Sequence, residues 1–122
     1  MSCRKWSNKV VTDEEFETLV DEALAQIPTH ITDRVRNLAV LIEDAHPDST
    51  GILGLYQGVP LTERTFDHTG FLPDTITIYR NSLKDYCSTP EELVEQIRIT
   101  VLHEIGHYFG MDHEQMHRLG IA

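Results

Sequence analysis

The chain has 122 residues, the size of one compact domain and too few for two separate hydrophobic cores. We therefore expect a single domain over 1–122, in which 1–11 form a flexible N-terminus. Lys and Arg number 10 against 20 for Asp and Glu, so the formal net charge is −10. A surface of this charge repels phosphate backbones and anionic headgroups, which argues against nucleic acids and membrane surfaces as partners.

The cysteines and the N-terminal sequence bear on the compartment. Cys3 and Cys87 are the only cysteines, so no disulfide framework is encoded and a reducing environment is expected. The basic residues near the start are not followed by the apolar run of a secretion signal. The apolar stretches are also far shorter than the roughly 20 residues that cross a bilayer. These features predict a cytoplasmic protein.

The first half of the chain contains one helical and two strand-like patterns. Thr12 and Glu15 form a capping-box pattern ahead of apolar residues at helical spacing, which predicts a helix over 13–27. A run rich in Val, Leu and Ile predicts a strand over 34–43. A turn-rich stretch follows, and the next apolar run predicts a second strand over 52–59 with glycine interruptions.

The second half ends in the strongest helix pattern. The polar segment 61–74 is expected to be a surface loop, and the alternating β-branched residues of 75–80 predict a strand. A capping Thr-Pro-Glu-Glu sequence starts a predicted helix over 90–109, which Gly110 should end in a left-handed conformation. A short helix is expected over 113–119. The fold class predicted is α+β, with a small mixed sheet of about three strands packed on the N-terminal and C-terminal helices.

A metal-binding pattern, HExxHxxGxxH, lies across the end of the long predicted helix. His103 and His107 are one helical turn apart, so both imidazoles lie on one face and can reach a single ion. Gly110 allows the chain to turn sharply and return His113 to the same ion. At this chain's composition the full pattern would arise by chance on the order of 0.0001 times. We expect His103, His107 and His113 to bind zinc.

The residue after the first histidine supplies the chemistry. Three protein ligands leave the fourth tetrahedral position of zinc to water, as in catalytic sites. Zinc lowers the pKa of that water toward about 7, and Glu104 would lie beside it to accept the proton and later deliver it to a leaving group. The sequence therefore predicts a zinc-dependent metallopeptidase that hydrolyses peptide bonds, with Glu104 as its general base.

The motif and the order of the wider chain carry a resemblance to a known family. Residues 103–113 resemble the zincin signature. The order of the segments 53–64 and 72–80, followed by the helix predicted over 90–109, resembles the minimal zincin-like metallopeptidases, a family of small bacterial proteins. This resemblance covers roughly residues 12–122. The resemblance implies a short mixed α+β fold, zinc as cofactor and a peptide or protein substrate. It also implies that the strand 75–80 forms the sheet edge and pairs with an extended peptide.

Two features depart from such families. The third ligand is often Asp in the minimal zincins, whereas His113 stands here. Metzincins also carry a methionine turn well downstream of the third ligand, and Met111 and Met116 are too close to His113 for that role. We expect both methionines to be core side chains.

Several polar residues near the motif have open roles. His113 is preferred over Asp112 and His117 as the third ligand, and Asp112 is then a candidate to accept a ring N–H of a zinc histidine. Tyr79, Tyr108 and His117 are candidates to donate a hydrogen bond to a developing oxyanion. For either tyrosine, a packed ring with a satisfied hydroxyl is the favoured expectation.

Two other functions fit parts of the pattern. Residues 106–113 also resemble the HxxxHxxGxDH site of a bacterial metal-dependent endoribonuclease family, but that family lacks a glutamate at the position of Glu104, and the net charge of −10 disfavours RNA. A zinc-stabilised peptide-binding module without catalysis is the second alternative.

Overall fold

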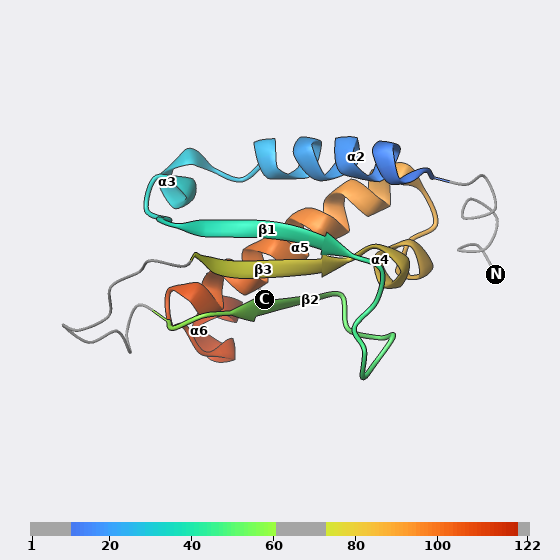
Figure 1. Cartoon of the computed structure of the whole chain (residues 1–122). Coiled ribbons are helices and arrows are strands. Elements are labelled where there is room, and N and C mark those ends of the chain that lie inside the picture. Colours follow the sequence, from blue (N-terminus) through green and yellow to red (C-terminus); the bar gives the residue numbers. More distant parts are fainter. Residues whose placement is uncertain (1–10, 61–72, 120–122) are drawn as a thin grey trace.

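The structure is a computed structural model that describes residues 11–60 and 73–119. It confirms the predicted α+β class, since helices combine with a three-stranded mixed sheet (Figure 1). In chain order the elements are α2 (Asp13–Ala25), α3 (Thr29–Thr32), β1 (Leu38–Glu43), β2 (Gly54–Gln57), β3 (Asp74–Tyr79), α4 (Arg80–Tyr86), α5 (Pro90–Tyr108) and α6 (His113–Arg118).

The strand order corrects one expectation about the sheet. The order is β1-β3-β2, with β3 parallel to β1 and antiparallel to β2. The strand predicted at 75–80 is therefore central rather than at the edge, and within the described residues β1 and β2 are the outer strands. The physical reason lies in burial: Ile76, Thr77 and Ile78 are all buried, so successive side chains on both faces of β3 are covered.

Helix α5 crosses one face of the sheet, and α2 packs against α5 (Figure 1). The core lies between these elements and includes Phe16 and Val20 from α2, Ile76 from β3, and Leu93 and Ile97 from α5. The helix α2 follows a complete capping box, since Thr12 accepts from Glu15 N and the Glu15 carboxylate accepts from Thr12 N. Because α5 is fixed against both the sheet and α2, its later turns are held at a constant position relative to β2.

Element boundaries differ from the predicted ones where local turns intervene. The helix predicted at 13–27 ends at Ala25. The strand predicted at 34–43 begins only at Leu38, because the chain first forms the short helix α3 and Asn37 takes a left-handed conformation with φ 57°. The strand predicted at 52–59 shortens to β2, and the unpredicted helix α4 starts directly where β3 ends.

Two expectations fall on parts of the chain outside the described residues. These are most of the N-terminal segment 1–11 and most of the loop 61–74. Val11, the first described residue, is buried in the core. Among the described helices none is long and apolar enough to cross a membrane.

Candidate metal centre

Three histidines from two helices meet at one point. His103 and His107 come from α5 and His113 from α6, and one ring nitrogen of each lies within 4.8 Å of the others. The ring centroids are 4.9 to 5.6 Å apart. His103 and His107 are half-buried and His113 is exposed, so the cluster opens to solvent on one side.

A tight turn between α5 and α6 returns the third histidine. Gly110 has φ 82°, the left-handed conformation expected from the sequence. Gly110 N donates to His107 O and Met111 N donates to Gly106 O, each at 2.9 Å, which is the paired bonding of a Schellman motif. Because this turn satisfies the last carbonyl groups of α5, the chain can reverse and start α6 at His113.

Helix α6 is held in place by its cap and by one apolar anchor. Asp112 accepts a hydrogen bond from Gln115 N at 2.8 Å, and Oε1 of Gln115 accepts one from Asp112 N at 2.9 Å. Met116 is completely buried, as a core side chain should be. The carboxylate of Asp112 is thus used to cap α6, and no hydrogen bond to a ring of the histidine cluster is found for it among the described residues.

The donor set fits zinc. A tetrahedral zinc ion with bonds of about 2.0–2.1 Å to imidazole nitrogen places its ligand atoms roughly 3.3 Å apart. Small side-chain rotations would bring the three nitrogens to that spacing from within 4.8 Å. Burial lowers the pKa of His103 and of His107, and neighbouring histidines lower each further. The neutral imidazoles that this favours are the form that binds metal.

Glu104 lies beside the cluster and is fixed by the neighbouring strand. It is buried, and its Oε1 accepts a hydrogen bond from the backbone N–H of Tyr56 at 3.1 Å. Burial raises the pKa of Glu104 from 4.5 to about 7, and the hydrogen bond from Tyr56 partly opposes that rise. A carboxyl group with a pKa near 7 is suited both to accept and to donate a proton at neutral pH.

The approach of β2 to α5 depends on a glycine. A Cβ atom at Gly54 would lie 2.6 Å from Cγ2 of Thr100 and 3.3 Å from the carbonyl oxygen of Thr77. Only a residue without a side chain can therefore occupy this point without moving its neighbours. The glycine lets β2 pass close enough for Tyr56 to reach Glu104.

Two hollows lie along β2 on either side of Glu104. One of about 470 Å³ is lined by residues that include Tyr56, His107 and Met111. The other, of about 220 Å³, is lined in part by Gln96 and His103. Gly54 and Glu104 border both hollows, so together they form a cleft between β2 and α5 with the carboxylate at its middle.

The tyrosines considered as oxyanion donors have structural contacts. The hydroxyl of Tyr108 donates to Arg36 O and accepts from Arg36 N, each at 3.0 Å. Tyr79 is buried at the end of β3 and packs edge-on against His46. His117 is exposed on α6 and is not part of the three-histidine cluster. Tyr108 therefore has the packed ring and satisfied hydroxyl expected from the sequence, and the ring of Tyr79 is packed as expected.

Sequence reasoning did not find the contribution of Tyr56. Its backbone N–H holds Glu104, and its hydroxyl donates to Asp74 at 2.6 Å at the start of β3. Because almost every residue type has a backbone N–H, the sequence alone does not show which residue donates this hydrogen bond. The one usable signal was Gly54, because a glycine inside a strand pattern often marks a close backbone approach.

A family model described as zincin-like metallopeptidase matches residues 24–121. The chain belongs to this family. The zincin-like match thus includes α5, the turn at Gly110 and α6, the segments that bring the histidine cluster together.

A solved structure resembles this zincin-like chain in fold. It is a conserved hypothetical protein from Thermo thermophilus, with 23% sequence identity and a TM-score of 0.55. The match covers 88% of this chain and 99% of that one. At this identity the likeness concerns the fold alone. No curated protein matches the chain.

Proposed function

We propose that this zincin-like protein is a zinc-dependent peptidase in which Glu104 is the general base. The observation that carries the proposal is the position of a buried carboxylate directly after His103, at the middle of a cleft that also contains His107. His103, His107 and His113 would hold the ion. A zinc ion bound there supplies the Lewis acidity that activates a water molecule for attack on a peptide carbonyl.

Glu104 would move the proton in this reaction. Its Oε1 is directed by the Tyr56 N–H, which leaves the second carboxylate oxygen for the attacking water. After accepting the proton from this water, the carboxyl group can deliver it to the amine nitrogen of the leaving peptide.

The strand β2 is the proposed docking edge for an extended substrate. Leu55 faces Thr77 in the antiparallel register, and the backbone groups of Gly54 and Tyr56 then point away from β3. The N–H of Tyr56 is already bonded to Glu104, so an extended peptide along the cleft would pair with the backbone groups of Gly54 and the carbonyl group of Tyr56. The family resemblance implies peptide pairing at the strand 75–80, which is β3. Because β3 is central in the sheet, we assign peptide pairing to β2 instead.

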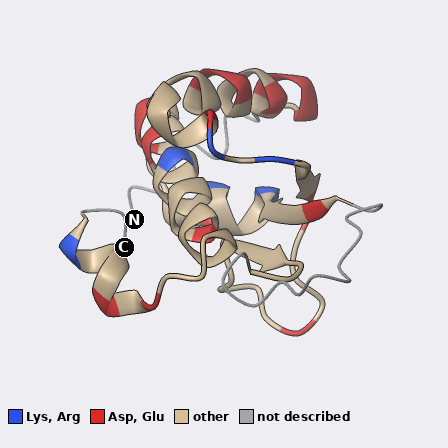
Figure 2. Ribbon diagram, turned by 90° about the vertical axis from the view of Figure 1, so that its left-hand side faces the viewer, with Lys and Arg blue, Asp and Glu red and all other residues tan. Residues whose placement is uncertain are grey.

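The charge distribution supports a peptide rather than RNA as substrate. Exposed acidic residues follow α2 along its length (Figure 2): Asp13, Glu14, Glu15, Glu17, Asp21 and Glu22. A formal net charge of −10 also disfavours the binding of a phosphate backbone. We expect no measurable RNA binding at physiological salt. A salt-dependent micromolar affinity for RNA would favour the endoribonuclease alternative.

The test combines cleavage with metal analysis on the same purified protein. A peptide library is incubated with the zinc-loaded protein, with the chelated protein and with Glu104→Gln. Cleavage by the zinc-loaded protein alone supports the proposal. If the wild type and Glu104→Gln both bind stoichiometric zinc and cleave the library equally, the proposed role of Glu104 is contradicted. If the protein binds zinc and cleaves no peptide, the non-catalytic peptide-binding module is favoured.

A further inference from the structure

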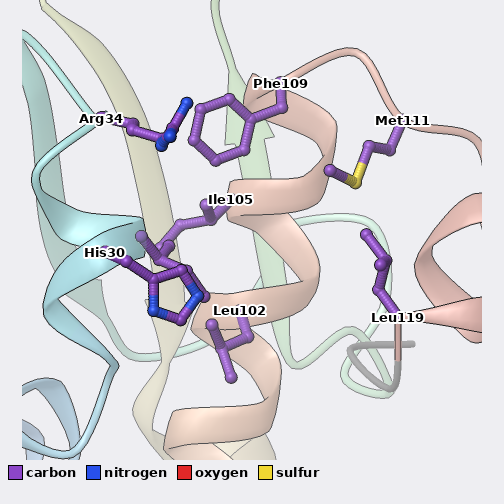
Figure 3. A pocket seen from close by; sticks show the side chains of 8 residues that line it. His30, Arg34, Leu102, Ile105, Phe109, Met111 and Leu119 are labelled. Atoms are coloured by element: carbon purple, nitrogen blue, oxygen red, sulfur yellow. The ribbon is translucent and has the colours of Figure 1, made fainter.

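An apolar pocket lies on the side of α5 that faces away from the metal cluster. It has a volume of about 420 Å³. Figure 3 shows Leu102, Ile105 and Phe109 projecting from α5, with His30 and Arg34 to the left of this helix and Met111 and Leu119 to its right. Leu102 and Phe109 lie about 100° or more around the helix axis from His103, because each residue advances the helix by about 100°. The α5 side chains that line the pocket therefore lie on a different face of the helix from the metal cluster, although Met111 borders both this pocket and the hollow beside Glu104.

One strong cation stands at the rim of this pocket. Arg34 follows α3, is exposed, and contributes its side chain to the lining beside His30 (Figure 3). Its guanidinium group makes no hydrogen bond or ion pair with any residue that the structure describes. Its planar fork of N–H donors is suited to a carboxylate.

We propose that this pocket binds a straight-chain carboxylate of fatty-acid type, with its carboxylate on Arg34 and its alkyl chain against Leu102, Ile105 and Phe109. Small-molecule sites combine apolar walls with a few polar groups that fix orientation, in volumes of about 300–1,000 Å³. The present pocket has that composition and size.

The walls favour an alkyl chain over a peptide end with the same charge. A hydrophobic C-terminal residue of a peptide would also present an apolar group and a carboxylate. It would bring peptide groups into the pocket as well, and these need hydrogen-bond partners when buried. The side chains that line the pocket are apolar except for His30 and Arg34, so an alkyl chain is the better fit.

The binding test uses hexanoate, octanoate and decanoate below their micelle concentrations, titrated into the purified full-length protein by calorimetry. Affinity should rise roughly fourfold for each added methylene if the chain is buried. Decanol should bind at least tenfold more weakly than decanoate, because it lacks the charge. Methyl resonances of Leu102, Ile105 and Leu119 should shift on titration, which locates the ligand in this pocket.

Two variants test the assigned contacts. Arg34→Gln should lower the affinity for decanoate at least tenfold and leave the affinity for decanol unchanged. The matched control is Arg36→Gln, at an exposed arginine that does not line the pocket, and it should leave both affinities unchanged. Leu119→Glu should also weaken the binding of decanoate. Leu119 is 62% exposed, so this change spares the core.

Three outcomes would overturn the proposal. They are an affinity that does not depend on chain length, equal binding to Arg34→Gln and the wild type, and preferential binding of short peptides ending in leucine. Association of two copies that protects the same methyl groups, with no decanoate bound, would assign the pocket to a protein interface instead.

Discussion

Glu104 in α5 and Tyr56 in β2 are joined by one hydrogen bond, from the backbone N–H of Tyr56 to Oε1 of the carboxylate at 3.1 Å. The two residues are 48 positions apart in the chain. A main-chain donor in a paired strand has little freedom to move, so it fixes the direction of the carboxylate without requiring a particular side chain. The orientation of the proposed base is therefore set by the position of the strand beside the helix.

The first prediction concerns the base itself. Glu104→Gln should retain zinc, because this side chain is not among the proposed ligands, while peptide hydrolysis falls at least 100-fold through loss of general base catalysis. Metal content by mass spectrometry and initial rates on one cleaved peptide measure the two effects. The same substitution at the exposed Glu114 of α6 serves as control and should change neither.

The second prediction concerns the third ligand. His113→Ala should lose zinc far more completely than His117→Ala, which removes an imidazole from the same helix outside the cluster. Competition with a chromophoric chelator gives the affinities. If His117→Ala emptied the site while His113→Ala remained loaded, the ligand assignment would be wrong.

The third prediction separates the cap of α6 from the metal. Asp112→Ala removes the N-cap and should destabilise α6 by about 1 kcal/mol, with a several-fold loss of zinc affinity. Asp112→Asn keeps a capping oxygen and should bind zinc like the wild type. A tenfold or greater loss in Asp112→Asn would instead show that the charge of the carboxylate acts on a zinc histidine.

The fourth prediction uses the raised pKa of Glu104 in the metal-free protein. The folded state holds this proton more tightly than the unfolded state, so the contribution of Glu104 to stability is greatest below pH 4.5 and is lost as the pH rises to about 7. Glu104→Gln avoids that loss. Its free energy of unfolding should exceed that of the wild type by on the order of 3 kcal/mol at pH 8 and match it near pH 4.

Urea unfolding in chelator at both pH values measures this difference. Because wild type and variant share the same histidines, their protonation largely cancels in the comparison. A difference that does not change between pH 4 and pH 8 would show that the burial of Glu104 does not govern its protonation.

The fifth prediction concerns the contact of β2 with α5. Gly54→Ala should destabilise the fold by about 1–3 kcal/mol, because its Cβ would lie 2.6 Å from Cγ2 of Thr100. Thr100→Ser removes that methyl group and keeps the hydroxyl, so it should recover most of the loss in the double variant. Strictly additive effects in this double-mutant cycle would mean that the two residues are not in contact.

Local sequence rules predicted the features that depend on neighbouring residues. The capping box of α2, the start of α5 at Pro90 and the left-handed Gly110 each follow from side chains within a few positions. The spacing of His103 and His107 on one helix predicted that their rings would approach each other, and the ring centroids are 4.9 Å apart. These parts of the site needed no knowledge of the sheet.

Long-range pairing explains what the sequence did not predict. Whether a strand is central or outer depends on which strands pair, and the alternation in 75–80 is compatible with either place. The short helices α3 and α4 contain too few residues to establish a helical period. The contact of Tyr56 with Glu104 arises only after β2 has paired with β3 and packed on α5.

The burial of Met116 has a consequence for how fast and how tightly an ion is captured. Because this side chain is fully buried, apolar packing that is independent of the ion holds α6 against the rest of the protein and keeps His113 close to His103 and His107. The conformational entropy of ordering this segment is then lost during folding rather than during metal capture. The three imidazoles can then act as one preorganised chelating group, so metal binding does not require a slow movement of His113 toward the other two ligands.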